Sequence, residues 1–577
     1  MALCFPLLLR AAPEIYVSPE GKDANPGTRM SPIRTLAHAR DLVRAMLPSM
    51  SSNITVYFKG GMYPMTGPAV FTAEDSGLNN HSVVYRNEAG EQPVFSGGKR
   101  VEGWSLHDRE SNIWMAKVSP EDHFRQIYVN GVKAIRASSD GPLGLRKTAT
   151  GFSFNHPLLA SCRHPSELEI VVLPHVWQQE RLPVAAINGD EITIQEPCWS
   201  VVAKGEYPGY SNPQRIENAY EFLTKPGYWY LDRQASTLYY IPRAGEKMES
   251  AVVEVPIAEQ LLVLTGSASA PVCGLQFSGI AFRLTNWLQP STGMGFPTSQ
   301  ANQPEPQNNA WTVKAALDCT GARQCAFQNC RFQQLGGNGI NVLTASQKVF
   351  IERCSFQDVA GTAIQIGRGS SVDMKLPKGS PDIVSRININ NCTIHDVATD
   401  YQSGCGIFVG LVQDCTISHN ELYHLPYTAI SIGWGWGTQV AFTSGNKILS
   451  NKIHDHMQAL KDGGGIYCNG YVEGGLIQGN HISKQGNIYG AYYLDDGSTN
   501  WIVKDNVCEM GRAEEWYLFK GHNNHASNNF TDNPKIRDMS DHKSPCTLTE
   551  TTVVQNGQWP ANARSIMDNA GPSRGKQ

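Results

Sequence analysis

An asparagine anchor recurs through the C-terminal half of the chain. It is followed within one or two positions by an apolar residue, at Asn391, Asn420, Asn451, Asn480, Asn506 and Asn529, in steps of 29, 31, 29, 26 and 23 residues. A unit of this length cannot bury its own apolar face, but stacked copies can. The repeat therefore predicts a solenoid with one coil per step.

A second column follows each anchor as a short strand that alternates apolar and other side chains. Residues 406–410, 429–433 and 465–470 have this pattern. Alternation with a period of two directs Ile407 and Val409, and their equivalents, into the core. A β-sandwich would need hairpin signals between the strands. We therefore predict an all-β right-handed parallel β-helix.

Four of the fourteen cysteines also follow the repeat. Cys330, Cys354, Cys392 and Cys415 occupy similar local settings, and the chain has no CxxC pair. This pattern favours buried free thiols over a disulfide framework or a zinc site. We expect no metal and no cofactor.

The coil pattern disappears between about 101 and 270. Asn130-Gly131 and Asn188-Gly189 are hairpin signals there, which predicts an inserted, antiparallel, β-sandwich-like domain. The expected divisions are 1–13, a remnant of a secretory signal; 14–100, an N-terminal cap and first coils; 101–270, the insertion; 271–545, the main β-helix; and 546–577, a C-terminal segment with a helix near 561–569.

Charge and hydropathy restrict the partners. The formal net charge is −4 and no basic run stands out, which disfavours nucleic acid. The apolar run 3–9 is too short to span a bilayer but suits the end of an export signal. We expect a secreted or periplasmic monomer without a membrane span.

Four segments resemble glycoside hydrolase family 141: residues 16–28 (YVSPEGKDANPGT), 125–131 (RQIYVNG), 462–467 (DGGGIY) and 494–498 (LDDGS). The similarity runs from about residue 14 to about residue 571. It implies a hydrolase of plant cell-wall polysaccharides or oligosaccharides, acting on an α-L-fucoside or a xylan-type linkage. The resemblance also implies that Asp462 is one of the catalytic carboxylates.

Most glycosidases need two carboxyl groups beside the scissile bond. Alignment of the strands places Gly410, Gly433, Asn469, Asp496 and Lys520 in one outward column, with coils about 4.8 Å apart. Asp495 then falls in the inward column. Asp495 and Asp496 are both catalytic candidates, and a turn at Asp-Gly is the structural alternative.

Asp462 precedes three glycines, which let the backbone approach a ligand closely. In strict alignment it lies seven residues from the Asp496 column, roughly 20 Å in extended chain. Glycosidase pairs lie about 5 to 9.5 Å apart. Either the glycines bend the chain, or the register is shifted, or the partner is another residue; a turn aspartate is the structural alternative.

The expected sugar contacts come from side chains near these coils. They are Asn469, Lys520, His522, Trp434, Trp436 and Tyr467, with Trp177, Glu180 and Arg181 as candidates from the insertion. Flat aromatic rings give sugars an apolar platform, although aromatics also fill cores. Tyr493 and Tyr517 are expected in the core.

Two other functions suit the same fold. A polysaccharide lyase needs a basic residue, and Lys520 and His522 supply part of that set. A non-catalytic glycan-binding or adhesin solenoid would retain the aromatics and glycines without needing two aspartates beside a lysine. A binder should keep its ligand when the aspartates are replaced.

Overall fold

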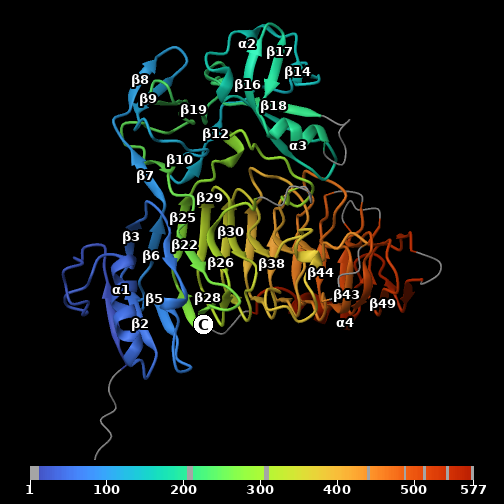
Figure 1. The fold of residues 1–577 in the computed structure, drawn as a ribbon. Helices are drawn as coiled ribbons and strands as arrows, with labels where there is room; N and C mark the ends of the chain where they lie inside the picture. Colours follow the sequence, from blue (N-terminus) through green and yellow to red (C-terminus); the bar gives the residue numbers. More distant parts are fainter. Residues whose placement is uncertain are drawn as a thin grey trace, which may run out of the picture.

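The protein is described by a computed structural model covering residues 12–204, 212–304, 311–437, 442–486, 489–510, 515–540 and 545–573. Three long parallel sheets, here sheets A, B and C, run along a solenoid (Figure 1). The predicted right-handed parallel β-helix is confirmed. The apolar run 3–9 of the expected signal lies outside the described residues.

Sheet A has thirteen strands. They are β1 (Glu14–Val17), β2 (Ile54–Phe58), β5 (Val83–Asn87), β24 (Leu275–Ser278), β28 (Ala326–Gln328), β31 (Phe350–Glu352), β34 (Asn388–Asn390), β37 (Thr416–Ser418), β40 (Lys447–Leu449), β43 (Tyr471–Gln478), β46 (Thr499–Lys504), β49 (His525–Ser527) and β52 (Thr547–Thr549).

Sheet B has twelve strands. They are β3 (Gly61–Pro64), β6 (Pro93–Ser96), β25 (Ala281–Thr285), β29 (Arg331–Leu335), β32 (Ser355–Val359), β35 (Thr393–Val397), β38 (Glu421–Tyr423), β41 (Lys452–His454), β44 (His481–Ser483), β47 (Val507–Glu509), β50 (Phe530–Thr531) and β53 (Thr552–Val553).

Sheet C has eleven strands and carries the candidate site. They are β4 (Ala69–Phe71), β22 (Leu262–Thr265), β26 (Ala315–Thr320), β30 (Asn338–Val342), β33 (Ile364–Ile366), β36 (Ile407–Val409), β39 (Ile430–Ile432), β42 (Ile466–Cys468), β45 (Tyr492–Leu494), β48 (Tyr517–Phe519) and β51 (Ile536–Asp538). The predicted inward residues, including Ile407 and Val409, lie in one core with the other two sheets.

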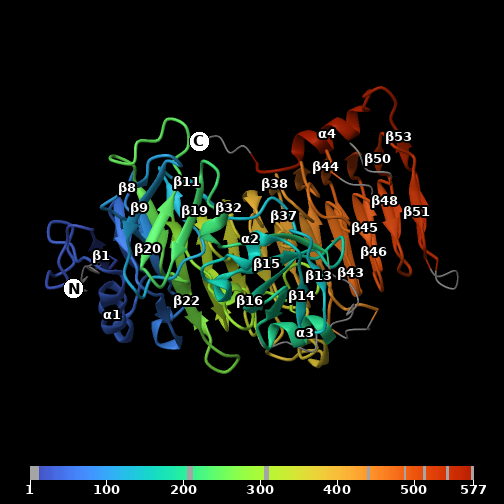
Figure 2. The same ribbon diagram turned by 90° about the horizontal axis from the view of Figure 1, so that it is seen from above.

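The insertion stands on one side of the solenoid (Figures 1 and 2). It consists of three mostly antiparallel sheets, ordered β11-β10-β21-β7, β12-β19-β20-β9-β8 and β13-β14-β17-β16-β15-β18. Their strands are β7 (Gly98–Val101), β8 (Ser105–Asp108), β9 (Ile113–Lys117), β10 (Tyr128–Val129), β11 (Val132–Lys133), β12 (Ile135–Arg136), β13 (Arg146–Lys147), β14 (Gly151–Ser153), β15 (Glu169–Val172), β16 (Glu180–Asn188), β17 (Glu191–Ile194), β18 (Pro213–Glu217), β19 (Tyr228–Asp232), β20 (Thr237–Tyr240) and β21 (Val253–Pro256).

The α-helices are short and peripheral: α1 (Leu36–Met46), α2 (Pro157–Ala160), α3 (Cys198–Lys204) and α4 (Ala561–Asn569). Thr35 is the N-cap of α1, and its side chain accepts a hydrogen bond from His38 N. The predicted C-terminal helix is α4, which packs on Val507 and Phe530. No helix in the described ranges is long and apolar enough to cross a membrane.

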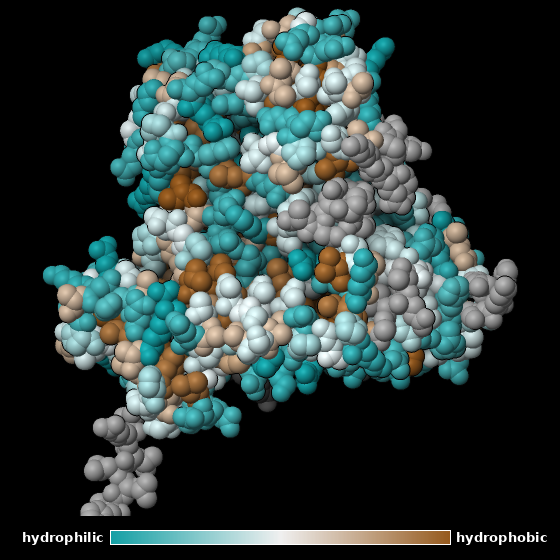
Figure 3. All heavy atoms as spheres, in the orientation of Figure 1, coloured by the Kyte–Doolittle hydropathy of each residue, from teal (hydrophilic) through white to brown (hydrophobic). Residues whose placement is uncertain are grey.

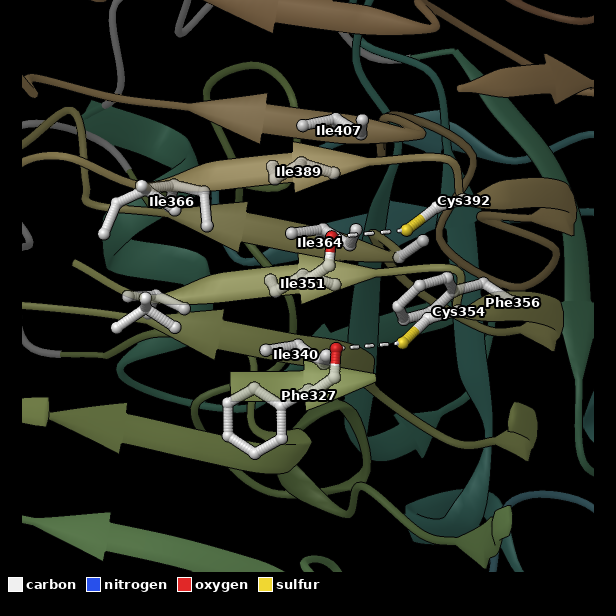
Figure 4. Packing of buried hydrophobic residues seen from close by; sticks show 14 of the residues in the cluster. Phe327, Ile340, Ile351, Cys354, Phe356, Ile364, Ile366, Ile389, Cys392 and Ile407 are labelled. Atoms are coloured by element: carbon white, nitrogen blue, oxygen red, sulfur yellow. Dashed lines mark hydrogen bonds between the residues drawn. The ribbon is translucent and has the colours of Figure 1, made fainter. Parts of the chain in front are cut away.

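One corner of the coil, between sheets A and B, carries cysteine in the early coils and asparagine in the later ones. Cys354 Sγ and Cys392 Sγ lie 3.4 and 3.6 Å from carbonyls of the preceding coil (Figure 4). Cys392 N then donates to Asn420 Oδ1 at 2.8 Å. Asn391 lies one residue outside this column and bonds Ser573 instead, so its place in the predicted repeat was wrong by one residue.

The asparagines form a buried ladder. Asn480 Nδ2 donates to Ile448 O and to Asn506 Oδ1, and Asn480 Oδ1 accepts from Asn451 N and Nδ2, all at 2.9 to 3.0 Å. Each side chain therefore satisfies the backbone of one neighbour and the amide of the next. This chain of contacts fixes the register between coils.

All thirteen cysteines in the described part of the chain are free thiols, and eleven of them are buried. This confirms the prediction of buried thiols for those eleven residues. Cys330, Cys354 and Cys392 therefore act as small apolar core residues with a weak hydrogen-bond donor.

Buried charges hold the insertion against the solenoid. Arg125 forms an ion pair with Glu169 and its Nε donates to Tyr401 OH at 3.3 Å, while Arg181 Nη2 donates to Asp400 O at 2.8 Å. Arg181 is thus buried in the junction, and the expectation that it reaches a sugar groove was wrong. On the face in Figure 3, hydrophobic side chains near this junction lie in small groups among hydrophilic ones.

We expect Asn480→Ala to lower the free energy of unfolding by roughly 3 kcal/mol, because it leaves several buried backbone and amide groups unsatisfied. The matched control is Asn390→Ala, which removes one 3.2 Å side-chain bond to Ser418 from a half-buried strand position. Urea unfolding of both variants measures the difference. Equal losses in the two would contradict a special role for the ladder.

Candidate functional site

The carboxyl ends of the sheet C strands form one outward column. Asn469 N donates to Ile432 O, Asp495 N to Cys468 O and Lys520 N to Leu494 O. The strand pairs Cys468–Leu494 and Leu494–Phe519 give the same register. The column therefore holds Asp495, and the predicted register, which placed Asp496 there and Asp495 in the core, was wrong by one residue.

Two tyrosine–aspartate bonds cross between the coils of β42 and β45. Tyr467 OH, on β42, donates to Asp495 Oδ2 at 2.6 Å, and Tyr493 OH, on β45, donates to Asp462 Oδ1 at 2.9 Å. The two rings lie edge to face with centroids 5.1 Å apart. Tyr493 was expected in the core, but it is the central, outward residue of its strand; Tyr517 does lie in the core.

Asp462 belongs to the same cluster as Asp495, not to a site some 20 Å away. Its backbone is left-handed (φ 57°), and its carbonyl accepts a hydrogen bond from Tyr427 OH at 2.8 Å. A Cβ at Gly464 would lie 2.5 Å from Gly490 O, so glycine is needed where the two coils approach. The chain bends through these glycines, which carries Asp462 towards Tyr493.

The electrostatics distinguish the three aspartates. Burial raises the pKa of Asp462 and the charges of Asp495 and Asp496 raise it further, against the opposing effects of Tyr493 and Lys520. Lys520 Nζ lies 2.7 Å from Asp495 Oδ1 and 4.0 Å from Asp496 Oδ1. Asp495 is 5% exposed, whereas the Asp496 side chain is 65% exposed.

The loop after β39 brings an exposed tryptophan to the aspartates. A Cβ at Gly470 would lie 2.6 Å from Gly435 N, and a Cβ at Gly497 would lie 2.4 Å from Gly437 N. Residues 433–437 therefore run across the two following coils and end beside Gly497, next to Asp496. Trp436 is 38% exposed at this point.

Several expected sugar contacts are not open to solvent. Trp434 is 2% exposed, packs against Phe408 at 5.0 Å and donates through Nε1 to Ser431 Oγ. Asn469 is fully buried, and its amide atoms have no hydrogen-bond partner among the described residues. Tyr467 is buried beneath Asp495. The side chains of these three residues are therefore not exposed for contact with a sugar.

His522 belongs to the turn that leads into sheet A. Its backbone N donates to Ser498 O, and its backbone pairs with Thr499 at the start of β46. Two further contributors had no sequence signal: Tyr427, and Gln300, whose Nε2 donates to Tyr427 OH at 2.6 Å. They come from distant segments, and only the fold brings them to Asp462.

The described residues contain no group of three or more His, Cys, Asp or Glu side chains arranged to hold a metal ion. The site that they form is an array of three carboxyl groups, two phenols and one ammonium. Such an array can donate and accept protons at two separate positions.

We expect Tyr493→Phe to raise the pKa of Asp462 further, because the hydroxyl hydrogen bond favours the ionised carboxyl. Carboxyl ¹³C NMR of aspartate-labelled protein measures this pKa, with Asp462→Asn identifying the resonance. Tyr57→Phe, on β2, is the control and should leave it unchanged. A fall in the pKa would mean that the phenol stabilises the protonated form.

The comparisons with known proteins agree with this architecture. Residues 382–556 match the family model described as a right handed beta helix region. A curated relative, "Uncharacterized protein YwoF" of Bacillus subtilis (strain 168), is 36% identical over 83 residues, which are 14% of this chain and 15% of that protein.

Two solved structures extend the likeness over the chain. The structure of XylC in complex with xylose has a TM-score of 0.54 at 12% identity, covering 93% of this chain and 86% of that one, which shows a shared fold. A structure described as "Glycoside hydrolase" has a TM-score of 0.82 at 26% identity, covering 98% of this chain and 99% of that one. The chain is thus a β-helix protein similar over nearly its whole length to a solved glycoside hydrolase.

Proposed function

We propose that this protein is a glycoside hydrolase whose reaction takes place at Asp462 and Asp496. The observation that carries the proposal is the pair of coils in which Asp462, Asp495 and Asp496 share one cluster with Lys520. Glycosidases usually pair one carboxyl group whose pKa is raised, which acts as the general acid, with a second carboxyl group that stays ionised. The likeness to a solved glycoside hydrolase supports the same function.

Asp462 is the proposed general acid. It is half-buried, and its raised pKa keeps it protonated to higher pH than an ordinary aspartate. A general acid acts only while protonated, so activity should be present below this pKa and lost as the pH rises through it. The proton would go to the oxygen of the leaving sugar.

Asp496 is the proposed second carboxyl, because a catalytic group must touch the substrate. Its side chain is exposed, whereas both oxygens of Asp495 already contact Tyr467 and Lys520. Asp495 is then a positioning residue: its charge helps to raise the pKa of Asp462 and holds Lys520 beside Asp496.

The proposed substrate is a plant cell-wall polysaccharide or oligosaccharide with an α-L-fucoside or xylan-type linkage, as the resemblance to family 141 implies. Trp436 supports a carbohydrate ligand, since it is partly exposed, the next residue, Gly437, lies against Gly497 in the turn that carries Asp496, and an exposed aromatic ring can stack against a sugar face. Export to the cell exterior or periplasm, and action as a monomer, belong to the same proposal.

A lyase reaction is less well supported. One candidate base for it is a neutral amine at Lys520. Burial alone would lower the pKa of Lys520, but the hydrogen bond and charge of Asp495 outweigh it and the pKa is raised. The ammonium form is therefore favoured, which opposes abstraction of a proton by this residue.

Replacement of the aspartates tests the mechanism. We expect Asp462→Asn and Asp496→Asn each to lower kcat/KM by roughly 100-fold or more, the usual contribution of acid–base groups. Asp495→Asn should lower it less and move the alkaline limb of the pH profile to lower pH, because one charge that raises the pKa of Asp462 is removed. Sugar release from fucosylated pectic oligosaccharides and xylan is the measurement.

The matched control is Asp414→Asn, an exposed aspartate with the same left-handed backbone (φ 55°) on another face of the solenoid. It should retain full activity. If Asp495→Asn lost activity and Asp496→Asn retained it, Asp495 would be the second catalytic carboxyl and Asp496 would not. Wild-type protein that releases no sugar but binds glycans would instead identify a binding protein.

Trp436→Ala should raise KM for an oligosaccharide by about tenfold with a smaller change in kcat, because the ring binds ground state and transition state alike. Trp104→Ala, in the insertion, serves as the control. Steady-state kinetics on one oligosaccharide series measures both. An unchanged KM in Trp436→Ala would remove this ring from the sugar-binding surface.

A further inference from the structure

A cavity of about 530 Å³ lies between the insertion and the coil that carries Asp462. Its walls are Leu173–Trp177 and Asn212 on one side and Ala459–Lys461 on the other. Volumes of roughly 300 to 1,000 Å³ are typical of small-ligand sites. The last lining residue, Lys461, directly precedes Asp462 in the chain.

The cavity wall is tied to the aspartate cluster. Lys461 N donates to Val176 O at 2.7 Å, so the backbone of the insertion holds the segment that leads to Asp462. Leu460 is buried in a cluster with Tyr427, which in turn contacts the carbonyl of Asp462. The cavity and the carboxyl are therefore fixed with respect to one another.

The chemistry of the lining suits a sugar with a negative charge. The rings of His175 and Trp177 lie parallel, with centroids 4.6 Å apart, and both residues line the cavity. Aromatic side chains are common contacts of sugar rings. Lys461 is exposed and lines the cavity, and none of the ion pairs found among the described residues includes it. A carboxylate on a bound sugar would supply the missing counter-charge.

The position of the cavity complements that of Trp436. Lys461 and Asp462 precede β42, whereas Asp496 and the tryptophan loop follow the ends of β42 and β45. A glycan that lies along the strand direction would pass from the cavity, over the aspartates, to Trp436. The insertion would thus bind the part of the substrate on the Asp462 side.

We propose that this cavity is a sugar-binding subsite for a uronic acid residue, with Lys461 contacting the carboxylate and the His175–Trp177 surface contacting the ring. The assignment of the bound sugar to the substrate of the aspartate cluster rests on the proposed function. Binding of the uronic acid itself does not. Substrates with an acidic sugar at this position should be preferred over neutral ones.

Saturation-transfer NMR with methyl β-D-glucuronide and methyl β-D-glucoside tests the subsite without any need for cleavage. We expect the wild type to bind the glucuronide more tightly, and Lys461→Gln to remove that preference by weakening glucuronide binding about fivefold. Lys447→Gln, an exposed lysine on sheet A, is the matched control and should bind like the wild type.

A second variant separates the ring contact from the charge contact. Trp177→Ala, checked for its fold by circular dichroism and thermal melting, should weaken both glycosides alike. Equal affinity of the wild type for the two glycosides, or unchanged binding in Lys461→Gln, would overturn the proposal. Retained glucuronide binding by a protein that cleaves no glycan would instead contradict the proposed hydrolase function and leave the subsite standing.

Discussion

The register between coils is the constraint on which the site depends. Successive coils pair through parallel backbone hydrogen bonds, and the buried asparagine ladder at one corner repeats the same alignment with side-chain amides. A shift of one residue would turn every strand side chain to the opposite face. The ladder therefore supports the register in which Asp495, and not Asp496, occupies the same strand column as Lys520.

The aspartate cluster is built from contacts between coils. Tyr467 and Asp495 are neighbours only because β42 and β45 are adjacent, and the same adjacency brings Tyr493 to Asp462. Neither coil contains a complete site. Since each bond joins one coil to the next, the stacking that buries the core also sets the pKa of Asp462.

The sequence predicted the fold well because its evidence is periodic. Alternation identified Ile407 and Val409 as inward residues, and the hairpin signals at Asn130-Gly131 and Asn188-Gly189 depend only on adjacent residues. The errors came from positions where periodicity is ambiguous. The strands of sheet C near the site are three residues long, so Asp495-Asp496 fits two registers equally well. Tyr493 has an apolar ring, which suits the core, and a polar hydroxyl, which suits the outer face of the strand. The hydrogen bond to Asp462 places it on the outer face, and the sequence pattern does not show that bond.

The part of the site that no local pattern could reveal comes from the insertion and its junction. Arg125 and Arg181 of the insertion donate hydrogen bonds to Tyr401 OH and Asp400 O, more than two hundred residues away, and Lys133 forms an ion pair with the Asp400 carboxylate. Buried ion pairs tolerate little displacement, because a separated charge would lack both water and partner. The junction thus fixes the position of the backbone around Val176 relative to the solenoid, and Val176 O there accepts a hydrogen bond from Lys461 N. An insertion joined by flexible linkers could not maintain one cavity wall beside Asp462.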